Sequence, residues 1–238
     1  MAPGFALNFV ASCALSLALT WPCPARESQK PQSGGIANQV GIVTDGLSGG
    51  QLRIWKSALD IVTAKDERGS YLHPTLYELY RQAETSGHLI RIELSEVESL
   101  SHAGRFSIEA LDANGKRHVA TIRLNLATIR RTHIGEDART ANGLIPFEGL
   151  RTRECYAEAL GHELAHAVSI LLDREYLQLY QDLKNEVAQY ERHLNGLEDS
   201  HDDRDRHRSE IDRLSAALEK PAQDAEARIW RELRGVGK

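Results

Sequence analysis

Cysteine is scarce in this chain of 238 residues, which contains only Cys13, Cys23 and Cys155. The first two lie in an apolar N-terminal segment. If that segment is removed, Cys155 is alone and no disulfide can form within the chain. A lone cysteine can act as a thiol nucleophile, but the simpler interpretation of Cys155 is a small apolar residue of a helix.

The chain also has no excess of positive charge. Its formal net charge is −5, and its basic residues alternate with acidic ones. Domains that bind nucleic acid usually gather basic residues on one face, so no nucleic-acid partner is expected. A hydrophobic fraction of 41% and a charged fraction of 26% are ordinary for a globular protein. At this length the chain can contain one domain with a core, with or without an appendage.

No Lys or Arg precedes the apolar run at residues 5–21, although positive charge normally opens a secretory signal. The run is followed by Pro22, Cys23, Pro24 and Ala25, and then by charged residues. We expect residues 1–25 to be a signal peptide, so that the protein is exported to the periplasm or the extracellular space. The alternative is that residues 5–21 stay uncleaved and anchor the protein in a membrane.

The most informative stretch is His162-Glu163-Leu164-Ala165-His166. Two histidines four residues apart lie on one face of a helix, where their ring nitrogens can bind one Zn²⁺ ion. Glu163 lies on the flank of this face, where it can take a proton from a water molecule that the ion activates, and then return it. The neighbouring residues are good helix formers with helical apolar spacing. The alternative is an ordinary amphipathic helix that carries two histidines, one of which pairs with Glu163.

This motif resembles the His-Glu-x-x-His signature of the zincin metallopeptidases. The resemblance covers residues 161–167 and the order of the elements before them. It implies a catalytic zinc ion, a glutamate general base and a peptide or protein substrate. A glutamate third ligand on a later helix is typical of the gluzincin branch. The Asn-Glu-x-x-Ser-Asp string of some gluzincins does not occur here, nor does the third histidine of the metzincins.

An α+β fold with a small mixed sheet is expected for residues 51–172, the zincin-like domain, after a linker at residues 26–50. The linker is rich in Ser, Gln, Pro and Gly and contains at most a short strand at residues 40–44. Helical spacing or alternation predicts the other elements: helices at 51–64 and 74–86, and strands at 88–94, 105–111 and 117–126. The turn residues at 112–116 predict a hairpin, and a polar loop is predicted for residues 130–150. In zincins the edge strand of such a sheet can pair with an extended substrate.

A long helical arm is predicted after the motif, because residues 162–195 contain neither Gly nor Pro and keep a nearly heptad apolar spacing. The metal helix would run on into an antiparallel hairpin at residues 173–220, with its turn near Gly196. Pro221 would end the return leg, and residues 221–238 would form a C-terminal helix that returns to the metal site. The arm is either a pair of structural helices or a surface that binds a partner.

A catalytic zinc ion needs a third protein ligand, and two arguments select Glu226. Helices rise equally per residue in both directions, so a turn near Gly196 returns residue 226 to the level of His166. A turn three residues later would favour Glu232 instead. On a helical wheel, Glu226 lies in an apolar face where a carboxylate needs a partner. That face contains Ile229, Trp230 and Leu233. The alternative partner is an arginine.

The sequence therefore predicts an exported zinc metallopeptidase in which His162, His166 and Glu226 bind Zn²⁺ and Glu163 is the catalytic base. The alternative is a non-catalytic, coiled-coil-type interaction protein with a structural or vestigial metal site. No motif identifies a residue that would stabilise the oxyanion. The candidates are Tyr156, Tyr176, His133 and His207.

Overall fold

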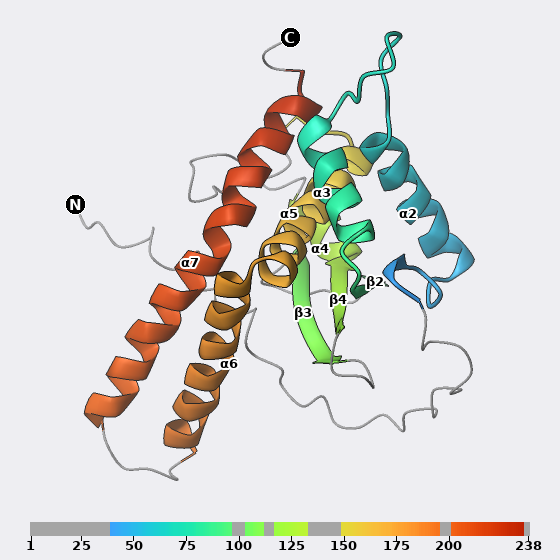
Figure 1. The fold of residues 1–238 in the computed structure, drawn as a ribbon. Coiled ribbons are helices and arrows are strands. Elements are labelled where there is room, and N and C mark those ends of the chain that lie inside the picture. The colour runs from blue at the N-terminus through green and yellow to red at the C-terminus, as the bar shows by residue number, and fades with distance from the viewer. Residues whose placement is uncertain (1–38, 97–102, 112–116, 133–148, 196–200, 236–238) are drawn as a thin grey trace, which may run out of the picture.

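The structure is a computed structural model, and it describes residues 39–96, 103–111, 117–132, 149–195 and 201–235 (Figure 1). The predicted signal peptide, most of the predicted linker, the hairpin turn at residues 112–116 and His133 lie outside the described residues. Within these ranges the fold is α+β, with six helices and a four-stranded mixed sheet, which confirms the predicted fold class. No helix in the described ranges is long and apolar enough to cross a membrane.

The sheet contains β1 (Gly41–Val43), β2 (Leu89–Ser95), β3 (Gly104–Leu111) and β4 (His118–Asn125), in the order β1-β2-β4-β3. β2 is parallel to both β1 and β4, whereas β3 is antiparallel to β4. All four strands agree closely with the predicted ones. β3 is an edge strand, so no described strand pairs with its outer side.

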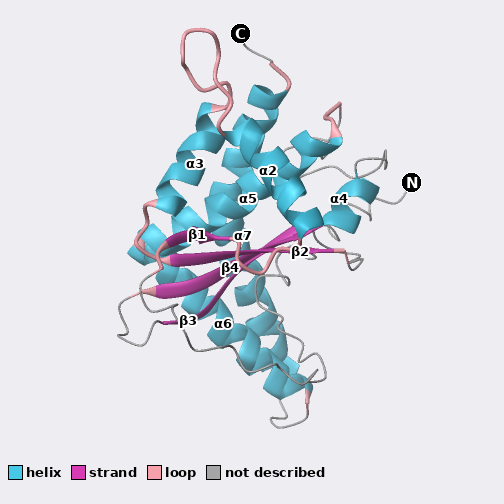
Figure 2. Cartoon of the chain, turned by 90° about the vertical axis from the view of Figure 1, so that its right-hand side faces the viewer, coloured by secondary structure: helices cyan, strands magenta, loops and turns pink. Residues whose placement is uncertain are grey.

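Alternation explains how the two central strands contribute to the core. Ile90 and Ile92 of β2 and Ile122 and Leu124 of β4 are buried, as is Phe106 of β3. Removing one such side chain from water contributes about 1.5–3 kcal/mol. The helices that cover this apolar face are packed against the sheet in Figure 2.

The helices are α2 (Gly49–Val62), α3 (Pro74–Glu84), α4 (Leu126–Thr132), α5 (Thr152–Leu172), α6 (Arg174–Leu194) and α7 (His201–Leu233). α2 begins two residues earlier than predicted, because Ser48 and Gln51 form a capping box at its start. α4 is a helix that the sequence does not predict: it directly follows β4, and only its C-terminal end overlaps with the loop predicted at 130–150.

α5 is the central helix, and it is buried on almost every side by the sheet and by α2, α3 and α7 (Figure 1). Gly161 permits this close packing. A Cβ atom at Gly161 would lie 2.5 Å from Cδ1 of Ile229 in α7 and 2.8 Å from Cδ1 of Leu76 in α3. The glycine therefore lets three helices approach one another next to His162.

The predicted arm exists, but two details of the prediction are wrong. α5 does not run on into the arm, because it ends at Leu172 and Asp173 caps a new helix. The Asp173 carboxylate accepts a hydrogen bond of 2.8 Å from the backbone N–H of Glu175. Pro221 does not end the return leg but lies inside α7, which continues to Leu233. The boundary predicted at residue 220 therefore falls within one helix.

Candidate metal centre

α5 and α7 lie side by side and bring three side chains together. His162 and His166 project from α5, and their Nε2 atoms are 3.2 Å apart. Glu219 projects from α7, with Oε1 3.5 Å from Nε2 of His166 and Oε2 3.6 Å from Nε2 of His162. These three residues are the group of possible metal ligands found among the described residues.

The spacing of these donor atoms suits a tetrahedral zinc ion. Bonds of about 2.0–2.2 Å in a tetrahedron place neighbouring ligand atoms roughly 3.3–3.6 Å apart. The Nε2 atoms of the two histidines are 3.2 Å apart and Oε1 of Glu219 is 3.5 Å from Nε2 of His166, and both distances are close to this range. With one ligand atom taken from each residue, all three atoms lie within 4.8 Å of one another. Two imidazoles and one carboxylate are also a common donor set for a catalytic zinc ion, and they leave its fourth position open.

Because the polar side chains of this cluster are largely buried, their charges need partners. The side chains of His166 and Glu219 are 2% and 9% exposed, and a buried carboxylate is costly unless a cation or hydrogen bonds compensate it. Burial alone would raise the pKa of Glu219, but the charge of His166 and hydrogen bonds from both histidines outweigh it and lower that pKa below its ordinary range.

His162 can also be compensated without a metal ion. Burial alone would lower its pKa, but hydrogen bonds with Glu219 and Glu226 raise that pKa well above its ordinary value. A protonated His162 between two carboxylates is therefore the competing explanation of this cluster.

Glu226, the predicted third ligand, contacts the other ring nitrogen of His162. Its Oε2 is 3.1 Å from Nδ1 of His162, whereas the Nε2 atom of that ring points toward His166 and Glu219. A carboxylate at this nitrogen fixes the tautomer and the orientation of a ligating histidine. Glu219 therefore belongs to the group of possible metal ligands, whereas Glu226 lies where a carboxylate that supports a ligating histidine would lie.

The path of the hairpin explains this difference. The prediction assumes straight, equal legs on the two sides of Gly196. Because α6 is a separate helix that begins after Asp173, its direction differs from that of α5 (Figure 1). The return path from His201 to Glu219 is consequently shorter than the outward path from His166 to Leu194.

The helical wheel contains a signal for Glu219 that the prediction overlooks. Glu219 precedes Glu226 by seven residues, which is about two helical turns, so both carboxylates lie on the same face of α7. The argument that selects Glu226 therefore applies equally to Glu219. A helix boundary at Pro221 would separate the two glutamates, and the structure shows that this boundary does not exist.

The side chain of Glu163 extends from α5 toward the edge strand β3. Its side chain is buried and packs against Gly104 at the start of β3, where a Cβ atom would lie 2.5 Å from Oε1 of Glu163. Burial raises the pKa of Glu163, and the neighbouring His162 and His166 oppose this shift. A carboxyl group with a raised pKa is a better proton acceptor for general base catalysis.

The candidate oxyanion-stabilising residues that the structure describes have contacts outside the cluster of His162, His166 and Glu219. The Tyr156 hydroxyl accepts a hydrogen bond of 2.9 Å from Nε of Arg130. His207 pairs with Glu186 between α6 and α7, at 2.6 Å. Tyr176 lines a separate groove. None of these three residues belongs to the group of possible metal ligands.

Two further sequence alternatives have structural roles. Glu232 accepts hydrogen bonds from the backbone N–H of Thr75 at 3.2 Å and from its hydroxyl at 2.5 Å, and so caps the start of α3. Cys155 is fully buried in α5, and burial raises the pKa of its thiol to about 12. A thiol that stays protonated is a poor nucleophile, which favours the apolar interpretation of this residue.

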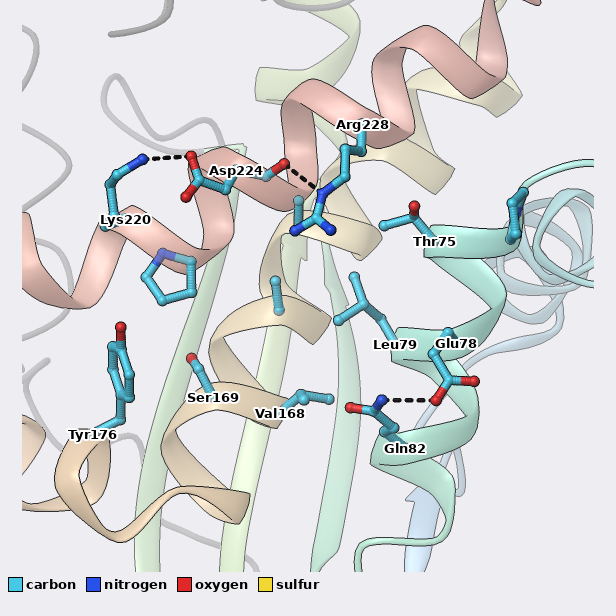
Figure 3. Close-up of a pocket in the computed structure, with 14 residues that line it drawn as sticks. Thr75, Glu78, Leu79, Gln82, Val168, Ser169, Tyr176, Lys220, Asp224 and Arg228 are labelled. Atoms are coloured by element: carbon cyan, nitrogen blue, oxygen red, sulfur yellow. Dashed lines mark hydrogen bonds and ion pairs between the residues drawn. The ribbon is translucent and has the colours of Figure 1, made fainter. Parts of the chain in front are cut away.

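A groove of about 660 Å³ runs between α3, α5, α6 and α7, and none of its lining residues is a candidate metal ligand (Figure 3). Most of its polar groups pair with one another. Lys220 forms an ion pair with Asp224 at 2.6 Å, and Gln82 donates to Glu78 at 2.7 Å. We assign no function to this groove.

Comparisons of the chain with protein-family models, with curated proteins and with solved structures give no match. The resemblance to zincins therefore rests on residues 161–167 and on the order of the elements before them.

Proposed function

We propose that the protein is an exported zinc-dependent metallopeptidase. His162, His166 and Glu219 would hold the ion, Glu163 would be the general base, and a peptide or protein would be the substrate. The observation that carries this proposal is the clustering of His162, His166 and Glu219, each of which offers one ligand atom within 4.8 Å of the other two, a grouping that suits one metal ion. Export is supported by the apolar N-terminal sequence alone.

Each residue has a distinct part in this proposal. A zinc ion at this site would supply Lewis acidity, which activates a water molecule and polarises a peptide carbonyl. Glu163 would accept the proton of the attacking water and deliver it to the leaving amine. Glu226 would hold the His162 ring in its ligating orientation. The burial of Glu163 against Gly104 keeps this base next to the edge strand.

A peptide substrate is supported by the position of β3 at the edge of the sheet. β3 begins beside Glu163 and leaves its outer side without a partner strand among the described residues. An extended peptide can add to such an edge through backbone hydrogen bonds. Its chain would then pass close to the general base.

The second candidate function is a non-catalytic interaction protein that uses the α6–α7 hairpin. It is favoured by the observation that a protonated His162 can lie between Glu219 and Glu226 with no metal ion. In that case the cluster would only join α5 to α7.

The variant Glu163→Gln tests the proposed mechanism. It keeps the size of the side chain but removes its basicity, so we expect zinc to stay bound and hydrolysis to fall by about 10²–10⁴-fold. Cleavage of a proteome-derived peptide library, followed by mass spectrometry, measures the activity over many candidate substrates at once. Equal cleavage by parent and variant would refute the assigned role of Glu163.

A further inference from the structure

His88, the residue before β2, forms hydrogen bonds with three other elements. Its backbone carbonyl accepts a hydrogen bond of 2.7 Å from the N–H of Gly41 in β1. Its ring nitrogen Nδ1 accepts one of 3.1 Å from the backbone N–H of His118, the first residue of β4. The ring also forms a hydrogen bond with the backbone of Leu171 in α5. One side chain thus joins the sheet to the central helix.

The contact with Leu171 lies at the end of α5, where the carbonyl groups of a helix need partners from outside it. α5 ends at Leu172, and the last four carbonyls of a helix find no N–H donor within the helix. A histidine ring can supply the missing N–H at this position. Since α6 begins at Arg174, directly after this turn, the His88 ring ties the base of the α6–α7 hairpin to the sheet.

The hydrogen bond with His118 requires a neutral His88 ring. A ring nitrogen that accepts a hydrogen bond carries no proton, so Nδ1 is free of hydrogen and Nε2 carries it. Protonation would place a hydrogen on Nδ1, opposite the backbone N–H of His118. Two donors cannot bond to each other, so the charged ring has to leave this position.

The surroundings of the ring also favour its neutral form. Burial lowers the pKa of His88, the charge of His118 lowers it further, and the hydrogen bond with Leu171 opposes this shift without reversing it. The ring of His118 is close, with 5.2 Å between the two centroids, and burial lowers its pKa as well. Among the described residues, no carboxylate shifts the pKa of His88. Glu84 of α3 accepts a hydrogen bond from the N–H of Ile42 instead, at 2.8 Å.

We propose that His88 is an acid-sensitive latch between the sheet and the end of α5. In its neutral form it holds the start of β4 and the last turn of α5 together. When it takes up a proton, it leaves the N–H of His118 and the carbonyl of Leu171, and the last turn of α5 is released. This inference concerns the conformation of the protein in acid and does not depend on the proposed zinc site.

Nuclear magnetic resonance of the purified protein, labelled with nitrogen-15, tests the latch. At about pH 8, above the ordinary histidine pKa of about 6.5, we expect Nδ1 of His88 to be unprotonated and Nε2 to carry the hydrogen. The ring should titrate below that ordinary value. The amide signal of His118 should shift with the same midpoint, because this N–H loses its acceptor.

The variant His88→Gln removes the titration but keeps a side-chain N–H donor. In the parent, the amides in the last turn of α5 should lose protection from hydrogen exchange as the pH falls from about 8 to about 5. In His88→Gln this loss should disappear.

The midpoint of urea unfolding gives a second readout for the same variant. Because the folded state keeps His88 neutral, the unfolded state binds more protons below about pH 6.5. The midpoint should therefore fall as the pH falls, and it should fall less in His88→Gln than in the parent.

His118→Gln is the matched control, because it removes the neighbouring ring and keeps the backbone N–H that His88 accepts. Without the charge of His118, His88 should titrate at a higher pH. The last turn of α5 should then lose its protection with this new midpoint.

A proton on Nδ1 of His88 at about pH 8 would overturn the latch. Equal pH dependence of exchange in the parent and in His88→Gln would overturn it as well. The first measurement uses the parent alone, so the inference can be refuted even if a variant does not fold.

Discussion

At the scale of single residues, the position of Glu163 depends on a glycine in another element. Gly104 gives the carboxylate its place between α5 and β3, because a side chain there would overlap with Oε1, Cδ and Cγ of Glu163. The sequence motif predicts that Glu163 is a base, but only the fold shows which residue leaves room for its side chain.

Gly104→Ala should therefore impair catalysis without removing the metal. The added methyl group would displace Glu163, and we expect hydrolysis to fall by about tenfold to a hundredfold, part of what general base catalysis contributes. Zinc content should stay that of the parent, since the ligands lie on α5 and α7. Cleavage of the peptide library and zinc analysis of the same preparation check both statements.

Gly50→Ala is the control for this prediction, because Gly50 lies in α2 and no atom lies within 4 Å of a Cβ placed there. It should leave hydrolysis unchanged. If Gly104→Ala is as active as Gly50→Ala, the contact between Glu163 and β3 has no catalytic role.

At the scale of elements, the packing of α5 against α3 and α7 sets the position of the candidate metal ligands. Gly161 precedes His162 and allows close contact with Ile229 and Leu76. Since α7 carries both Glu219 and Glu226, any separation of α5 from α7 would also separate the carboxylates from the histidines.

Gly161→Ala should destabilise the protein. Overpacking in a core costs about 1–3 kcal/mol, and the better helix propensity of alanine, about 1 kcal/mol, offsets part of it. We expect a lower midpoint of urea unfolding. The double variant Gly161→Ala/Ile229→Val should recover part of the loss, because valine lacks the Cδ1 atom that the new Cβ would meet. A higher midpoint for Gly161→Ala alone would show that this contact is not tight.

The strands, the first two helices and the metal helix could be predicted because each is set by local patterns. Alternation and turn residues mark the strands, and Pro74 marks the start of α3. The break at Asp173 is missed because neither Gly nor Pro signals it; a side-chain cap produces it instead. Pro221 misleads in the opposite sense, since α7 continues through it. Both errors act on the predicted path of the arm, and together they explain why the sequence prediction selects Glu226 and overlooks Glu219, the third member of the group of possible metal ligands.

At the scale of the whole molecule, the site depends on segments far apart in the sequence. The edge strand contributes Gly104, the central helix contributes the histidines and Glu163, and the return leg of the hairpin contributes Glu219. The hairpin therefore has a direct role in the proposed enzyme, because α7 would complete the metal centre. A non-catalytic interaction protein would not need this role.

The zinc content of three purified proteins tests the metal centre most directly. The proteins are the parent, Glu219→Gln and Glu226→Gln, and each is dialysed before its zinc is quantified by elemental mass spectrometry. We expect about one zinc ion per chain in the parent, the number one tetrahedral site holds. Glu219→Gln should lose the ion, because it removes a ligand.

Glu226→Gln should retain zinc with an affinity weakened about 10–100-fold, as expected for a residue that supports a ligand. Loss of zinc in Glu226→Gln but not in Glu219→Gln would instead make Glu226 the ligand. A parent protein without zinc would contradict the proposal outright and leave the protonated His162, held between its two carboxylates, as the explanation of the cluster.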